Sequence, residues 1–303
     1  MKVFVAGASG TIGVPLVRAL VKAGHDVTAM TRTPSKQESL RVLGATPVVA
    51  DALDPDAVAR AVNAAAPDVV IHQLTALPKA GGVKRASDLE PTNRLRIDGT
   101  RNLLAAAVAA HARRIIVGSF APLGTPGPDA PSGTQRAAEA VASMESQVLE
   151  ASRRGLIEGI VLRYGLFYGP DNPATQNMIT MAKRRMLPVI RGDHSLLPVI
   201  HVDDAVSATV AALDHGNRGS VYDIVDDHPA SMTEIVRTLA ERAGAPRPFT
   251  VPAWLPRLLA PYMAQITSVR MPLSNAAARA GLGWRPAYPT IDEGLSRTIS
   301  KAA

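Results

Sequence analysis

The stretch Val3-Phe4-Val5-Ala6-Gly7-Ala8-Ser9-Gly10-Thr11-Ile12-Gly13 decides the fold of this chain. Its first residues are β-branched or aromatic, which is typical of a buried strand. Three glycines follow, and the apolar positions from Leu16 to Val21 then have the spacing of one helical face. A strand, a glycine turn and a helix in this order present the free N–H groups of a helix N-terminus to a pyrophosphate.

Each glycine of this stretch meets a physical requirement of the turn. Gly7 permits the tight turn, Gly10 lets the backbone approach a phosphate, and Gly13 lets the helix pack closely on the strand. Hydroxyl groups between them add hydrogen-bond donors, and an ordinary flexible turn is the alternative interpretation. The residues predicted to bind the nucleotide here are Gly7, Ser9, Gly10, Thr11, Ile12 and Gly13.

The glycine spacing, with two residues between successive glycines, resembles that of the short-chain dehydrogenase/reductase superfamily. It is most similar to the extended and atypical branch, the relatives of the NAD-dependent epimerase/dehydratase family. The alternation of strands and helices in the first half independently predicts an α/β fold, a Rossmann-type doubly wound parallel sheet. We expect a small, mainly helical C-terminal lobe beside it.

Composition limits the classes of function. The 303 residues include 33 Lys and Arg against 26 Asp and Glu, a formal net charge of +7. The basic residues are scattered and aromatic residues are few, so we expect no nucleic-acid partner but an anionic ligand such as a phosphorylated cofactor. The absence of Cys excludes disulfides and Cys-ligated zinc, and fits a cytoplasmic protein. We expect no signal peptide, no membrane span and no metal site.

The element order follows from hydrophobic patterning and turn residues. Strands after the first are expected at 26–31, 46–51, 68–74, 113–119, 157–164 and 221–225. Helices are expected from Asp54-Pro55, at 93–111, 134–154 and 205–213, with a loop at 121–133.

The alternation of strands and helices ends near residue 168. We therefore expect a cofactor-binding Rossmann domain at 1–168, its sheet completed by about 201–228. A substrate-binding lobe would comprise 169–200 and 229–303. It would close over the crevice at the carboxyl ends of the strands.

The end of the second strand predicts which dinucleotide binds. An acidic residue there would accept hydrogen bonds from a ribose 2′-OH, whereas a basic one accommodates a 2′-phosphate. Arg32 lies 19 residues beyond Gly13, between Thr31 and Lys36, and a guanidinium offers a planar fork to phosphate. These three residues favour NADP(H), and a solvated arginine after a strand is the alternative.

The resemblance implies further cofactor contacts. It implies that Asp51 faces the adenine, flanked by Ala52 and Leu53, and that one segment after the fourth strand lines the middle of the cofactor. A later segment would pass the nicotinamide ring, although a core aromatic with a bonded hydroxyl is an equal interpretation of its tyrosine. These two segments contribute Gln73, Leu74 and Thr75, and Tyr164, Gly165 and Leu166. We expect His72 to be packed inside its strand.

The catalytic pattern of the resembled family is incomplete. Its redox members use a Tyr as acid/base, a Lys four residues later and a Ser after the fifth strand. Ser119 matches that Ser, with simple strand-end capping as the alternative. No Tyr in the chain is followed by Lys four residues later. If Glu145 matches the family's glutamate, the two missing positions are Ala137 and Val141.

Polar side chains lie near these two positions, and the sequence does not choose among them as a proton donor: Thr134, Gln135, Arg136 and Glu139. The first hypothesis is an NADP(H)-dependent oxidoreductase acting on a small carbonyl, alcohol or imine. The alternatives are a catalytically silent NADP(H)-binding sensor or partner-binding protein, and a sugar-nucleotide epimerase or dehydratase. Leu197-Pro198 stands where such epimerases carry Arg-Asp, which disfavours the last. A homodimer through helices 94–111 and 134–154 is also implied by the resemblance.

Overall fold

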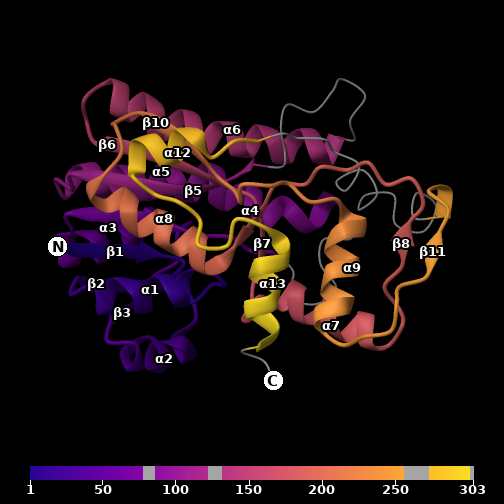
Figure 1. The fold of residues 1–303 in the computed structure, drawn as a ribbon. Coiled ribbons are helices and arrows are strands. Elements are labelled where there is room, and N and C mark those ends of the chain that lie inside the picture. The colour runs from indigo at the N-terminus through magenta and orange to yellow at the C-terminus, as the bar shows by residue number, and fades with distance from the viewer. Residues whose placement is uncertain (78–85, 122–131, 256–272, 301–303) are drawn as a thin grey trace.

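The centre of the molecule is a seven-stranded sheet in which every described pairing is parallel (Figure 1). The computed structural model describes residues 1–77, 86–121, 132–255 and 273–300. Its strand order is β10-β6-β5-β4-β1-β2-β3, so the order reverses between β1 and β4. The strands are β1 (Lys2–Ala6), β2 (Asp26–Thr31), β3 (Thr46–Val49), β4 (Val69–His72), β5 (Arg114–Phe120), β6 (Glu158–Tyr164) and β10 (Ser220–Ile224).

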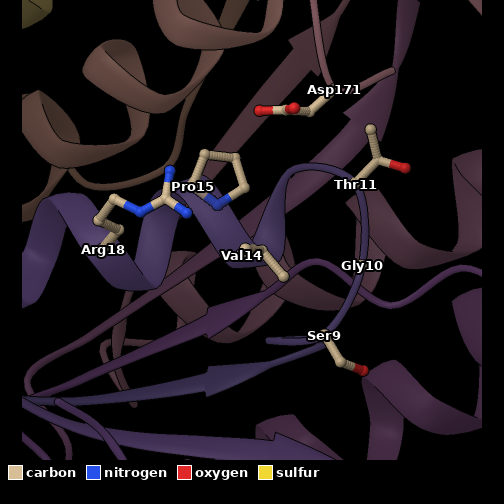
Figure 2. Close-up of a pocket in the computed structure, with 7 residues that line it drawn as sticks. All are labelled: Ser9, Gly10, Thr11, Val14, Pro15, Arg18 and Asp171. Atoms are coloured by element: carbon tan, nitrogen blue, oxygen red, sulfur yellow. The ribbon is translucent and has the colours of Figure 1, made fainter. Parts of the chain in front are cut away.

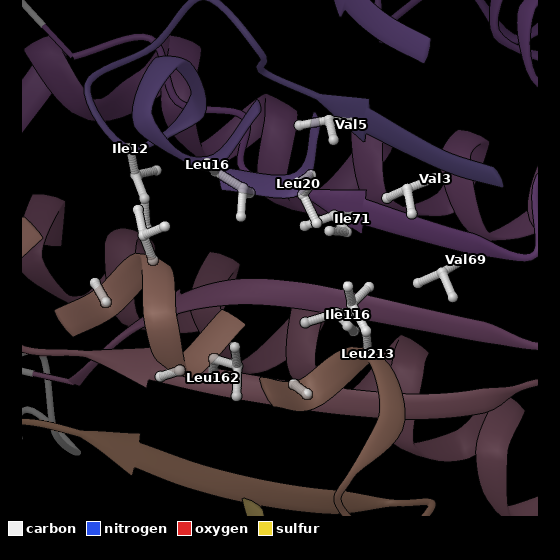
Figure 3. Close-up of a cluster of buried hydrophobic side chains, with 14 of the residues drawn as sticks. Val3, Val5, Ile12, Leu16, Leu20, Val69, Ile71, Ile116, Leu162 and Leu213 are labelled. Atoms are coloured by element: carbon white, nitrogen blue, oxygen red, sulfur yellow. The ribbon is translucent and has the colours of Figure 1, made fainter. Parts of the chain in front are cut away.

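Helices cover both faces of this sheet because its strands carry apolar residues on both sides. On one face, Leu16 and Leu20 of α1 (Gly13–Lys22) pack with residues of α8 (Val202–Asp214) and α12 (Ala276–Leu282), as Figure 3 shows in part. On the other face lie α3 (Pro55–Ala65), α5 (Thr100–Ala109) and α6 (Ser132–Arg153). The short helix α2 (Gln37–Val42) packs beside β3.

A smaller group of elements lies at one end of the sheet (Figure 1). Its own apolar cluster joins α7 (Pro173–Lys183), α9 (Met232–Arg242) and α13 (Ile291–Ser300). Two short parallel pairs complete it: β7 (Leu166–Tyr168) with β9 (Val199–His201), and β8 (Val189–Ile190) with β11 (Thr250–Val251). The division of the chain into a Rossmann domain and a substrate lobe stays a prediction.

The expected fold class is confirmed, and the expected strands differ from the observed ones by a few residues at their ends. The third strand ends at Val49, two residues before Asp51. The helix expected at 205–213 begins three residues earlier, at Val202. Most of the loop expected at 121–133 lies outside the described residues, but Ser132 and Gly133 already belong to α6.

The single helix expected at 93–111 is wrong in detail. The structure has α4 (Glu90–Arg94), a π-helical turn (Leu95–Gly99) and then α5. Neighbouring elements bind this turn and the residue that follows it: Gln147 Nε2 donates to the Ile97 carbonyl oxygen at 3.1 Å, and Thr100 Oγ1, at the start of α5, is 3.1 Å from His72 Nε2. Contacts of this kind, together with the low helix propensity of Gly99, favour a widened turn over a regular one.

None of the described helices is both long and apolar enough to cross a membrane. Within the same ranges, no group of three or more His, Asp or Glu side chains has an arrangement that could hold a metal ion.

A buried carboxyl group joins the sheet to the C-terminal elements. Tyr168 donates its hydroxyl proton to Asp226 Oδ2 at 2.8 Å, while Asp226 Oδ1 is buried without a hydrogen-bond partner. Burial raises the pKa of Asp226 to about 8, and the nearby charge of Asp204 acts in the same direction. Asp226 is therefore protonated in the folded protein at pH values at which the unfolded chain has lost that proton.

This pKa difference predicts a pH-dependent stability. Because the folded state holds the extra proton, the contribution of Asp226 is present at low pH and is lost as pH rises from about 4 to about 8, by at most about 1.4 kcal/mol per pH unit. Asp226→Asn cannot ionise, so its Tm relative to wild type should rise between pH 5 and pH 8. Thermal unfolding monitored by circular dichroism measures it, with the exposed Asp214→Asn as control. A constant Tm difference across this range would contradict the prediction.

Candidate functional site: a dinucleotide crevice

The glycine turn between β1 and α1 lies directly against the segment that follows β4. Gly7 has φ +89°, and a Cβ placed on it would be 2.6 Å from the Gln73 carbonyl oxygen. A Cβ on Gly13 would collide with the Gly7 carbonyl oxygen. Any side chain at these two positions would therefore force the turn away from the sheet.

The N-terminus of α1 is suited to an anion. Its first turn has no side-chain cap and no acidic residue, so the helix dipole and its free N–H groups are not neutralised there. A cavity of about 410 Å³ opens beside this turn (Figure 2). It is lined by Ser9, Gly10, Thr11, Val14, Pro15, Arg18 and Asp171.

Four of these lining residues, Val14, Pro15, Arg18 and Asp171, were not predicted from the sequence, and two of the four are charged. Arg18 is an exposed residue on the outer part of α1, and Asp171 comes from the segment just before α7. Figure 2 shows the Arg18 side chain beside Pro15 and the Asp171 carboxylate above the turn at Thr11. Only the fold brings Arg18 and Asp171 together, because 153 positions separate them in the chain. Arg18 adds a positive charge, and Asp171 a negative one, at the rim of the cavity beside the glycine turn.

The end of β2 meets the glycine turn through hydroxyl groups. Ser9 Oγ and Thr31 Oγ1 are 3.1 Å apart, and the Thr33 N–H donates to Thr31 Oγ1 at 3.2 Å. Thr31 is buried, whereas Arg32 and Lys36 are exposed on the turn that follows. This corner therefore contains hydroxyls and cations, and residues 31–36 include no carboxylate.

The turn after β3 lies on the other side of this corner. Asp51 is exposed, and its Oδ1 accepts a hydrogen bond from the Leu53 N–H at 3.0 Å. Ala52 is buried, and its carbonyl oxygen accepts from Asn102 Nδ2 at 2.9 Å. The three residues predicted to surround an adenine thus form one ordered turn at the carboxyl edge of the sheet. Whether they contact a cofactor stays a prediction.

Tyr164 and Gln73, both predicted to line the cofactor, bind each other instead of facing open space. Gln73 Nε2 donates to the Tyr164 hydroxyl oxygen at 2.9 Å. Thr209 donates its own proton to the Ala205 carbonyl oxygen, so the Tyr164 hydroxyl donates to Thr209 Oγ1 at 2.7 Å. Burial raises the pKa of Tyr164 to about 12. Its side chain is a neutral, fully bonded core phenol. Leu74, Thr75, Gly165 and Leu166 continue the same two segments at the crevice.

His72 is a buried structural side chain at the end of β4. Its Nδ1 accepts a hydrogen bond from the Leu74 N–H at 3.1 Å, which leaves the proton on Nε2, facing Thr100. Burial, with a smaller contribution in the same direction from the charge of Arg96, lowers the pKa of His72 to about 4. The imidazole is therefore neutral at ordinary pH.

Ser119, the residue predicted for catalysis, is held by two charged side chains. It is 5% exposed and donates its hydroxyl proton to Glu145 Oε1 at 2.6 Å. Arg163 binds both carboxylate oxygens of Glu145, at 2.9 Å through Nε and at 2.5 Å through Nη2. Ser119 and Arg163 are register partners on β5 and β6. The hydroxyl proton thus points toward α6, and only the lone pairs of Ser119 remain for a ligand.

The two positions expected for the missing Tyr and Lys, if Glu145 matches the family's glutamate, carry apolar side chains. Ala137 and Val141 are both buried on α6. Of the polar candidates around them, Arg136 donates to Glu90 Oε1 at 2.8 Å, and Glu139 is exposed. Thr134 and Gln135 are half-buried. The structure does not single out one of the four as a proton donor.

Comparisons with known proteins agree with this geometry. The model of the NAD dependent epimerase/dehydratase family matches residues 3–225. A 3-diazoavenalumate denitrifying reductase of Streptomyces is 40% identical over 98% of this chain and 100% of its own length. A 2-alkyl-3-oxoalkanoate reductase of Stenotrophomonas maltophilia is 29% identical over 82% of this chain and 77% of its own. Among solved structures, UDP-glucose 4-epimerase of Thermotoga maritima has a TM-score of 0.79 at 21% identity, covering 99% and 98% of the two chains.

The ion pair of Glu145 predicts a ranking of two substitutions. Ser119→Ala leaves Glu145 bonded to Arg163 and should lower the free energy of unfolding by about 1 kcal/mol. Glu145→Ala leaves both the Ser119 hydroxyl and the Arg163 charge without their acceptor, and should cost about 2–4 kcal/mol. Urea denaturation measures both. An equal loss of unfolding free energy in the two variants would contradict this ranking and would show that the ion pair between Arg163 and Glu145 contributes little to stability.

Proposed function

The chain belongs to the NAD-dependent epimerase/dehydratase family, and we propose that within it the protein is an NADP(H)-dependent reductase of a small electrophilic substrate. Its reductase relatives make it an oxidoreductase of this family. The preference for NADP(H) and the class of substrate are the proposal. The main observation in support of NADP(H) is the corner formed by Thr31, Arg32 and Ser9. Cations and hydroxyl groups are present in this corner, and residues 31–36 include no carboxylate.

The residues present fit a phosphorylated dinucleotide. The close approach of Gly7 to Gln73 leaves the uncapped N-terminus of α1 open to a pyrophosphate. Arg32 and Lys36 would hold the 2′-phosphate, and Asp51 with its two successors would surround the adenine. Backbone groups of Gly165 and Leu166 would lie beside the nicotinamide. Bound NADPH would supply a hydride at this end of the crevice.

The described side chains around this end of the crevice restrict the substrate chemistry. Reduction of a carbonyl produces an alkoxide, which needs a proton donor. Tyr164 is a buried phenol whose hydroxyl donates a hydrogen bond to Thr209 Oγ1, and the Ser119 hydroxyl donates to Glu145. Ala137 has no proton to give. None of these three side chains has a proton to give, so a substrate that accepts hydride without being protonated fits them better than a ketone, which would need one of Thr134, Gln135, Arg136 or Glu139 as donor.

An arenediazonium compound is such a substrate. A hydride that forms a bond to the ring carbon displaces N2, which leaves with both electrons of the broken C–N bond, so no proton is consumed. The 40% identical relative is named for denitrifying a diazo compound, 3-diazoavenalumate. We therefore place an aryl diazo compound first among substrates, and keep a small carbonyl or imine second because another relative is named as an oxoalkanoate reductase.

A catalytically silent NADP(H)-binding protein is the second candidate function. Ala137 and Val141 favour it, because these buried apolar residues would stand at the positions of the catalytic pair if Glu145 matches the family's glutamate. Sugar-nucleotide epimerisation has less support, since Leu197-Pro198 replaces the expected Arg-Asp pair and the likeness to the epimerase structure concerns the fold. Oxidation of NADPH by the unaltered protein would distinguish the reductase from the silent binding protein.

Cofactor preference is tested by isothermal titration calorimetry with NADPH and NADH. The wild type should bind NADPH at least tenfold more tightly, and Arg32→Ala should lose most of that preference because the fork to the 2′-phosphate is removed. Arg153→Ala, an exposed arginine at the far end of α6, is the control. Equal affinity for both dinucleotides in the wild type would overturn the NADP(H) proposal.

Substrate class is tested by mixing the protein with NADPH and either an arenediazonium carboxylate or a panel of small ketones and imines. We expect faster NADPH oxidation with the diazonium compound, and one N2 released for each NADPH consumed. The control is the same mixture with protein whose glycine turn is blocked by Gly13→Val. Turnover of ketones alone would contradict the assignment, and turnover of nothing would favour the silent protein.

A dimer remains part of the proposal. An apolar groove of about 510 Å³ lies between α5 and α6, and Leu104, Val108 and Leu156 line it. Leu156 is 47% exposed. A second copy of this chain would cover these side chains, as the sequence resemblance implies. Sedimentation velocity of the wild type and of Leu104→Asp should give a dimer and a monomer respectively.

A further inference from the structure

Polar side chains line the buried face of the helical segment that runs from α4 through the π-helical turn into α5. An apolar side chain would be expected at most positions that pack against a sheet and another helix. Here four buried residues of this face are polar or charged. They are Thr92, Asn93, Arg96 and Thr100.

The two threonines of this face have clear structural partners. Thr92 Oγ1 accepts the Ala76 N–H at 3.0 Å, which ties α4 to the segment after β4. Thr100 Oγ1 is bonded to His72. These bonds show that the face lies against the carboxyl end of β4, on the side of the crevice.

Asn93 differs from both threonines. It is 5% exposed, and neither its Oδ1 nor its Nδ2 has a hydrogen-bond partner. A buried amide without partners costs free energy, because it gives up its hydrogen bonds to water and gains none. An amide whose donor and acceptor are both unsatisfied is expected where a ligand supplies the missing partners.

Two contacts show which part of α6 lies opposite Asn93. The ion pair between Arg136 and Glu90 joins the beginning of both helical segments, and the bond from Gln147 to the Ile97 carbonyl joins them further on. Asn93 lies between these contacts on its own segment. Ala137 and Val141 lie between them on α6, which packs against α4 (Figure 1). The unsatisfied amide is therefore level with the two apolar residues that replace Tyr and Lys.

The chemistry of the amide selects its ligand. Oδ1 needs a donor and Nδ2 needs an acceptor, so a carboxylate, which only accepts, would satisfy half of the group. A hydroxyl group donates and accepts. A vicinal pair of hydroxyls, such as a ribose carries, matches both atoms at once.

We propose that Asn93 binds the ribose hydroxyls of the nicotinamide half of the cofactor, at the level where Val141 replaces a lysine. This inference rests on the proposed function, since it requires a bound dinucleotide. Asn93 is then a positioning residue: it fixes the riboside, and through it the nicotinamide face, without moving a proton. A neutral amide from a neighbouring helix thus substitutes for a cation on α6.

The test compares two ligands that share the adenosine half. NADPH carries the nicotinamide riboside and adenosine 2′,5′-bisphosphate does not. In Asn93→Leu, which keeps the number and branching of the side-chain heavy atoms, NADPH should bind on the order of tenfold more weakly, and the bisphosphate should bind as in wild type. Without ligand, the Tm of Asn93→Leu should equal or exceed that of wild type, because an unsatisfied buried amide is removed.

Asn275→Leu is the matched control. Asn275 is also a buried asparagine, but its Nδ2 donates to the Val225 carbonyl oxygen and to Asp227 Oδ1, both at 2.8 Å. Its replacement should lower the Tm and leave the affinity ratio of the two ligands unchanged. Asn93→Ser provides a second variant whose smaller side chain avoids overpacking.

The outcomes separate this inference from the function on which it rests. If wild type binds neither NADPH nor NADH, the proposed function fails. If wild type binds NADPH and the ratio of the two affinities is unchanged in Asn93→Leu and Asn93→Ser, Asn93 has no contact with the riboside and the inference is wrong. An equal weakening of both ligands would overturn it as well, since the loss would then come from the fold.

Discussion

The contact between the Gly7 backbone and the Gln73 carbonyl group is the constraint on which the rest of the site depends. Because a Cβ would lie 2.6 Å from that oxygen, the turn can reach the end of β4 only as glycine, at a positive φ. This approach sets the direction of α1 and leaves its N-terminus uncapped over the crevice. It also fixes Gln73, whose side chain then supports Tyr164.

From Gln73 the constraint extends through buried hydrogen bonds to the far helices. The Gln73 amide, the Tyr164 hydroxyl and the Thr209 hydroxyl form one directed chain that ends on the backbone of α8. On the other face, Ser119 and Arg163 meet on Glu145. Each donor in these two networks has one acceptor. The floor of the crevice is therefore rigid and keeps its protons, since satisfied buried networks resist rearrangement.

The sequence alone predicted the features that depend on local residue patterns. Hydrophobic periodicity located the strands, and the glycine spacing located the turn and its helix. The features it missed depend on distant partners: the π-helical turn at Leu95–Gly99 is bound by Gln147, and Asp171 reaches the phosphate turn from the segment before α7. Asn93 belongs to the same class, because a missing partner is visible only once every neighbour is placed. The cofactor contacts predicted at Arg32 and Asp51 stay predictions.

The described titratable groups on the floor of the crevice also limit the reaction. Burial raises the pKa of Tyr164 to about 12 and lowers that of His72 to about 4, so each keeps one protonation state across the neutral range. A general acid must change its state during turnover, and neither side chain does so readily. In the proposed reaction, hydride transfer is productive because the substrate carries its own leaving group. If Glu145 matches the family's glutamate, Ala137 and Val141 stand at the positions of the Tyr and the Lys, and two apolar residues there fit that proposal. Where no alkoxide forms, an acid and its activating cation have no role, and the protein need only orient the dinucleotide.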